Sequence, residues 1–152
     1  MCRAGVLGAV VLMVAAAGAG CCVCREAYGR IPQGREYDRA TPRGAALAFQ
    51  YAIRREDWAL AWCLASERTR QEHAYVKFRY ALPRAEFQGG GLVVDFIARA
   101  QVGQRVHDVQ PPDPQKRRVK VSADEQTYWL VLVLEGNLWS LDLQDTIGAN
   151  PP

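Results

Sequence analysis

Residues 127–143 read TYWLVLVLEGNLWSLDL and form the most apolar stretch outside the N-terminus. Thr127 to Leu134 is apolar at almost every position, which predicts a central strand with cover on both faces. Glu135-Gly136-Asn137 predicts a tight turn, because Gly and Asn adopt positive φ at little cost. Leu138 to Leu143 alternates apolar and polar side chains, as a half-buried strand does. We therefore expect a hairpin whose far face is covered by the tether, by the C-terminal tail or by a second copy of the protein.

Two further strands are expected before this hairpin. Val102 to Val109 predicts the first, and Arg117 to Ala123, which alternates regularly, predicts the second. Pro111-Pro112-Asp113-Pro114 predicts a loop between them, because proline has no amide to donate to a ladder. Asp124-Glu125 predicts the turn into the hairpin, and the polar residues from Asp145 to Pro152 predict a frayed tail. The second half of the chain thus predicts an antiparallel sheet of about four strands.

Helix-start signals divide the part of the domain that precedes this sheet. Thr41 followed by Pro42 predicts a helix to about Arg54, since Thr caps free amides and Pro suits the first turn. Asp57 and Ser66 are further capping residues. The predicted helices cover residues 42–54, 58–65, 67–78 and 92–101. Helices that precede a meander predict the α+β class, with helices packed on one face of a curved sheet.

Two segments resemble NTF2-like domains, the cystatin-like α+β cones. Residues 41–70, TPRGAALAFQYAIRREDWALAWCLASERTR, are similar to the opening helices of that superfamily. Residues 130–143, LVLVLEGNLWSLDL, resemble its final hairpin, with Gly136 at the turn and Trp139 in the last strand. The resemblance covers roughly Thr41 to Leu143 and is greatest with the small exported lipoproteins of this superfamily. It implies a conical pocket between the helices and the concave face of the sheet.

The resemblance also implies that apolar and aromatic side chains line this pocket, which would suit a small apolar ligand. Core packing is the competing interpretation, because a domain this small needs most of its aromatic residues for its interior. The candidate lining residues are Phe49, Tyr51, Trp58, Trp62, Tyr75, Tyr80, Phe96, Tyr128 and Trp139.

The first twenty residues, MCRAGVLGAVVLMVAAAGAG, predict a signal peptide. Arg3 is their only charged residue, and Val6 to Ala17 has the length of a signal-peptide apolar region. A membrane-spanning helix would need roughly 20 apolar residues. Gly18-Ala19-Gly20-Cys21 resembles the lipobox of bacterial lipoproteins, although that motif usually has Leu where Gly18 stands.

The lipobox resemblance implies a lipid on Cys21, with Cys22 as the alternative, and a protein anchored in the cell membrane or outer membrane. Ordinary secretion and a retained membrane anchor are the competing interpretations. Residues 21–40 are polar and aperiodic, which predicts a flexible tether before a domain at 41–145 and a tail at 146–152. In an oxidising compartment, Cys24 could pair with Cys22 or with Cys63.

Charge and motif content narrow the function classes. The formal net charge of +3, from 19 basic and 16 acidic residues, is too small to indicate nucleic-acid binding. The run Lys116-Arg117-Arg118 predicts a solvated loop and strand edge. No His and Cys set has zinc-site spacing, so we expect no metal and no cofactor. The sequence favours a non-enzymatic, membrane-tethered binding or interaction module of the bacterial cell envelope, and a homodimer through the sheet is compatible with it.

An enzyme of the ketosteroid-isomerase or SnoaL type is the alternative function. That chemistry requires a carboxylate base facing a tyrosine hydroxyl or a protonated acid that stabilises an enolate. Asp95 is the weak candidate base, and its possible tyrosine partners are Tyr51, Tyr75 and Tyr80. Burial would raise the pKa of its carboxyl and suit it to that role, whereas on an amphipathic helix the same carboxyl points to water. No residue is assigned a catalytic role by the resemblance.

Overall fold

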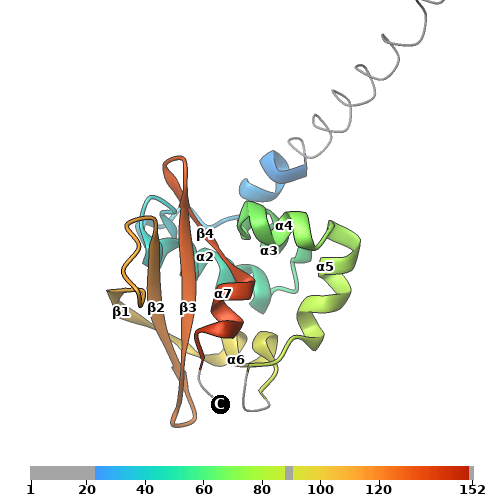
Figure 1. The fold of residues 1–152 in the computed structure, drawn as a ribbon. Coiled ribbons are helices and arrows are strands. Elements are labelled where there is room, and N and C mark those ends of the chain that lie inside the picture. Colours follow the sequence, from blue (N-terminus) through green and yellow to red (C-terminus); the bar gives the residue numbers. More distant parts are fainter. Residues whose placement is uncertain (1–22, 88–90, 151–152) are drawn as a thin grey trace, which may run out of the picture.

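The structure is a computed structural model that describes residues 23–87 and 91–150. The chain runs from a group of short helices into a sheet and ends in one more helix (Figure 1). In order, the elements are a helical segment at 23–28, η1 (Arg35–Tyr37), α2 (Pro42–Arg54), α3 (Trp58–Leu64), α4 (Glu67–Glu72), α5 (Tyr75–Ala81), η2 (Leu82–Arg84), α6 (Val93–Arg99), β1 (Gln101–Asp108), β2 (Lys116–Ala123), β3 (Gln126–Glu135), β4 (Leu138–Leu141) and α7 (Leu143–Gly148).

Three predicted caps start three helices. Thr41, Asp57 and Ser66 each accept a hydrogen bond from the backbone amide three residues further on, at 3.0, 3.1 and 3.1 Å. These bonds satisfy amides that have no partner within the helix. The predicted starts of α2, α3 and α4 are therefore confirmed.

The helix predicted over residues 67–78 is wrong as a single element. The structure divides this region into α4 and α5, with His73 and Ala74 in extended conformations between them. The indole Nε1 of Trp62 donates to the carbonyl of His73 at 3.0 Å. The His73 carbonyl therefore accepts a hydrogen bond from a side chain of α3 and not from a continued helix. The chain turns at this point, and the side chain of Phe78 is buried in the core.

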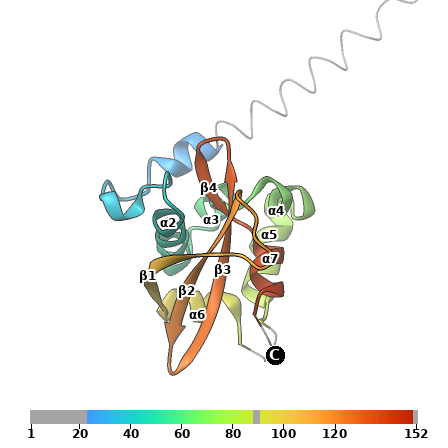
Figure 2. The same ribbon diagram turned by 60° about the vertical axis from the view of Figure 1, so that its left-hand side comes forward.

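The strands form one antiparallel sheet in the order β1-β2-β3-β4, so each strand pairs with its sequence neighbour. Helices α2 and α6 pack on its inner face (Figure 2). Alternation places one set of strand side chains toward these helices. The buried inner-face residues are Val119, Val121, Tyr128, Leu130 and Leu132. The predicted α+β class, with helices on one face of an antiparallel sheet, is confirmed.

A buried amide joins the two helices of this layer. Gln50 lies on α2 with almost no exposure, and its Nε2 donates to the carbonyls of Ile97 and Ala100, both at 2.7 Å. The last carbonyls of a helix have no partner within that helix. Gln50 therefore completes the end of α6 and fixes it against α2.

The prediction of a frayed tail is wrong for the residues up to 150, because this part of the chain forms α7. Asp142 caps this helix by accepting from the amide of Asp145 at 2.9 Å. The side chains of Thr146 and Asn150 are fully buried. The polar composition of the segment serves hydrogen bonds to the sheet and does not indicate solvent exposure.

The partner of α7 is the free edge of β3. Strand β4 pairs only with Leu132 to Glu135, so β3 has an open edge beyond that point. The Val131 amide donates to Thr146 Oγ1 at 2.9 Å, and the Asp142 amide donates to the Val131 carbonyl at 3.0 Å. Asn150 accepts from the Trp129 amide at 2.7 Å and donates to its carbonyl at 3.2 Å. Helix α7 thus replaces the missing part of β4 and protects an edge that could otherwise pair with another chain.

Residues 23–40 differ from the flexible tether that the sequence predicts. Cys24 forms a disulfide with Cys63 of α3, and Ala27 is fully buried. The hydroxyl of Tyr28 donates to the Cys63 carbonyl at 2.6 Å. Arg30 forms an ion pair with Asp57 at 2.7 Å. The described part of this segment is therefore fastened to the helical layer, and Cys63 is the partner chosen from the two that the sequence leaves open.

Candidate functional site

Several of the predicted pocket residues belong to the packed core of the described chain. Phe87 stacks on Tyr128 with ring centroids 4.3 Å apart, and Phe96 meets Tyr128 edge-on at 4.5 Å. Phe49 and Trp139 are also buried in the core. These rings occupy the space between the helices and the sheet, in agreement with the core-packing interpretation.

The other candidates lie toward the periphery. Tyr51, Trp58 and Trp62 are partly buried against the core. Tyr75 meets the Trp62 ring edge-on, with ring centroids 6.1 Å apart. Tyr80 is 62% exposed on α5. Asp95 is also exposed, on α6, so it lacks the burial that the enzyme hypothesis requires.

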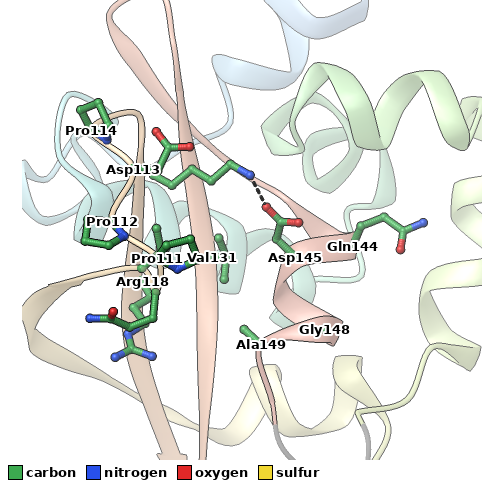
Figure 3. A pocket seen from close by; sticks show the side chains of 13 residues that line it. Pro111, Pro112, Asp113, Pro114, Arg118, Val131, Gln144, Asp145, Gly148 and Ala149 are labelled. Carbon is green, nitrogen blue, oxygen red and sulfur yellow. Dashed lines mark hydrogen bonds and ion pairs between the residues drawn. The ribbon is translucent and has the colours of Figure 1, made fainter.

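A groove of about 630 Å³ lies on the opposite, outer face of the sheet. Its floor includes Val131 and Arg118 from the central strands. One wall is the β1–β2 loop, and the other is α7 (Figure 3). The lining residues are Val109, Gln110, Pro111, Pro112, Asp113, Pro114, Lys116, Arg118, Val131, Gln144, Asp145, Gly148 and Ala149.

Hydrogen bonds hold the loop wall in place. Asp113 accepts from the Gln115 amide at 2.9 Å, and its carbonyl accepts from the Lys116 amide at 3.1 Å. Arg117 Nη1 donates to the carbonyls of Asp113, Pro114 and Lys116, at 3.1, 3.3 and 2.7 Å. The Leu134 amide donates to the Gln115 carbonyl at 2.8 Å, which extends the β2–β3 ladder into the loop. The proline-rich wall is therefore braced on both sides.

A network of charges links the floor to the α7 wall. Lys116 Nζ lies 2.7 Å from Asp145 Oδ2, the ion pair that is dashed in Figure 3. Arg68 Nη2 lies 2.8 Å from Asp145 Oδ1. Arg68 also pairs with the buried Asp142, which accepts a further bond from Ser66 Oγ at 3.1 Å. Burial by itself would raise the pKa of Asp145, but the bonds from Lys116 and Arg68 outweigh it and hold that pKa below its ordinary value. Asp145 is therefore already paired with two cations.

Arg118 has a different environment. Its guanidinium carbon lies 4.3 Å from the ring centroid of Trp129, a cation–π arrangement. The His107 ring meets the same indole edge-on, with centroids 5.0 Å apart. The Nε of Arg118 is buried and has no hydrogen-bond partner among residues 23–87 and 91–150. Aromatic stacking therefore positions this cation without neutralising it.

The structure separates the three basic residues that the sequence groups together. Lys116 pairs with Asp145, Arg117 braces the loop, and Arg118 stacks on Trp129 beneath the groove. The prediction of a merely solvated strand edge is therefore wrong for this run. Alternation in β2 does place Lys116 and Arg118 on one face, but the sequence contains no signal that α7 closes that face.

Searches against protein-family models and against curated proteins find no match to this chain. Among the described residues, no helix is long and apolar enough to cross a membrane. The same residues contain no group of three or more His, Cys, Asp or Glu side chains that could hold a metal ion. Cys21 and Cys22, the predicted lipidation sites, lie outside the described residues.

Proposed function

We propose that this protein is a membrane-tethered, non-enzymatic binding module of the bacterial cell envelope, and that it holds its ligand in the outer groove. The observation that carries the proposal is the contrast between the two faces of the sheet. Aromatic rings fill the inner side, whereas the outer side has a groove of about 630 Å³ with braced walls. That volume falls in the range typical of small-molecule sites.

The disulfide supports the proposed location. Disulfides persist in secreted and envelope proteins and are rare where cytosolic reductants act. The Cys24–Cys63 bond joins the start of the described chain to α3. It agrees with the interpretation of residues 1–20 as an export signal and of Cys21 as the lipid-bearing residue.

The anchor can be tested by expressing the full chain in a bacterium fed with an alkyne-bearing fatty acid. We expect the wild-type chain and Cys22→Ala to incorporate the label and to sediment with membranes. Cys21→Ala should lose both properties. Labelling that is retained in Cys21→Ala and lost in Cys22→Ala would move the site to Cys22. Absence of label in every variant would refute the lipid anchor.

The groove can be tested by amide NMR of the full chain in detergent micelles, with a library of neutral, acidic and basic fragments as probes. A Cβ at Gly148 has no heavy atom within 4 Å, and Gly148 lines the groove, so we expect Gly148→Trp to place its indole there, and Gly148→Ala is the matched control. We expect fragments to shift the amides of Val131 and Ala149 in the wild type and in Gly148→Ala, but not in Gly148→Trp. Shifts that survive in Gly148→Trp, or that cluster on the inner face, would refute the groove as the site.

The enzyme alternative receives no support from the position of its candidate base. Asp95 is exposed on α6, and Tyr80, one of its possible partners, is 62% exposed on α5. We therefore propose binding alone.

A further inference from the structure

We propose that Arg118 is the ligand-recognition residue of the groove, and that it binds the carboxylate of a small ligand whose apolar part lies on Val131 and the proline loop. This assignment rests on the proposed function, because it names the ligand class of the same groove.

Three of the four charged groups in the lining are already engaged. Lys116 and Asp145 pair with each other at 2.7 Å, and Asp145 also binds Arg68. The Asp113 carboxylate accepts from the amide of its own loop. Among the described residues, the side chain of Arg118 has no acidic partner within 4.0 Å, and its Nε has no hydrogen-bond partner. The lining carries two cations and two carboxylates, and Arg118 is the one of its two cations that no carboxylate neutralises.

The guanidinium is also held in advance of binding. Its stacking on Trp129, with His107 against the same indole, reduces the side-chain entropy that a ligand would otherwise have to remove. A planar guanidinium offers paired donors that match the two oxygens of a carboxylate. The Nε of Arg118 is buried without a hydrogen-bond partner in the described residues, so a carboxylate bound at the rest of the guanidinium would also stabilise it through space.

The remaining lining determines the rest of the ligand. Val131 is 3% exposed and forms part of the floor, with Pro111, Pro112 and Ala149 on the walls beside it. These apolar groups suit a short hydrocarbon or peptide segment attached to the carboxylate. The carboxylate could belong to a free organic acid or to the C-terminus of a peptide, and both sources present the same chemistry to Arg118.

The test uses the full chain in detergent micelles and follows the Trp129 indole and the Val131 and Ala149 amides by NMR. Isovalerate and isovaleramide have the same apolar group and differ in the anion, while N-acetyl-prolyl-alanine represents a peptide C-terminus. We expect isovalerate or the acetylated dipeptide to shift these signals and isovaleramide to shift them little. The tighter of the two acids identifies the source of the carboxylate.

Three variants decide the role of Arg118. Arg118→Gln should weaken carboxylate binding about 10- to 100-fold, the value of a lost charge-assisted hydrogen bond. Arg118→Lys should weaken it less, because it retains the charge without the planar fork. Lys120→Gln is the matched control, since Lys120 is an exposed cation two residues along on the same face of β2. Lys120→Gln should bind carboxylates like the wild type. For each variant, an unchanged NMR spectrum outside the groove verifies the fold.

The outcomes separate this inference from the proposed function. Equal shifts with isovaleramide, equally tight binding of inorganic phosphate, or full binding by Arg118→Gln would overturn the carboxylate assignment while leaving the groove as a site. Equal loss in Lys120→Gln would reduce the effect to general surface charge and would overturn it as well. If no fragment of any class shifts the amide signals of the groove and Gly148→Trp changes nothing, the proposed function fails together with the carboxylate assignment.

Discussion

Asn150→Ala should destabilise the fold although Asn150 lies in a polar C-terminal segment. Its side chain accepts from the Trp129 amide at 2.7 Å, donates to the Trp129 carbonyl at 3.2 Å and also bonds the Thr146 carbonyl. Truncation leaves the two backbone groups of Trp129 without partners at the open edge of β3. An unsatisfied buried polar group costs about 1–3 kcal/mol. Because the truncation itself admits water to part of this edge, we expect a total loss of about 2–3 kcal/mol.

The assay is urea unfolding of the full chain in detergent, with hydrogen exchange at the Trp129 amide as a local readout. A loss of this size would lower the melting temperature by roughly 5–10 °C for a chain of this length. Gln144→Ala is the control, because Gln144 is exposed on α7, the helix that precedes Asn150, and should change stability by less than about 0.5 kcal/mol. If Asn150→Ala and Gln144→Ala unfold at the same urea concentration and Trp129 exchanges equally slowly in both, then α7 does not complete the edge of β3.

Two other perturbations act elsewhere in the fold. Replacing Cys24 and Cys63 with Ser opens a cross-link that spans 39 residues, and chain entropy predicts a loss of about 3–4 kcal/mol in the free energy of unfolding; an unchanged urea midpoint in the double variant would contradict this. Acid should remove the contribution of Asp145 to the free energy of unfolding, because the pKa of Asp145 is lower in the folded chain than in the unfolded one. That contribution is complete above about pH 4, the ordinary aspartate range, and it is lost as the pH falls through the folded pKa. Asp145→Asn should therefore be less stable than the wild type at pH 7, the difference should shrink below pH 4, and a difference independent of pH would refute the ion-pair explanation.

Local signals predicted most of the elements because each signal is confined to a few neighbouring residues. Thr41, Asp57 and Ser66 mark helix starts through bonds to amides three residues away, and these predictions are confirmed. The hairpin around Gly136 is confirmed as well, with Gly136 at positive φ. Such features need no knowledge of the rest of the chain.

The errors arise where distant parts of the chain meet. Asp142 followed by Asp145 has an N-terminal cap spacing, and Leu143 and Ile147 lie one turn apart, so α7 had a weak signal. The reason for its burial is the short length of β4, which is not evident from the alternation of residues 138–143. The groove depends on both facts and on the folded-back proline loop. It was therefore beyond reach of the sequence, although Arg118 itself belonged to a run that the sequence singled out.

The Cys24–Cys63 bond also sets how far the domain can reach. If residues 21–40 were an open chain, it could extend by about 70 Å and would average about 25 Å. If Cys21 carries the proposed lipid, only Cys22 and Val23 separate it from the fastened Cys24, which allows about 10 Å. Helix 23–28 and the β3–β4 turn lie at the same end of the molecule in both views (Figures 1 and 2). The domain would then stand directly on the membrane with that end down, and it would sample ligands in the layer next to the lipid headgroups instead of searching across the envelope.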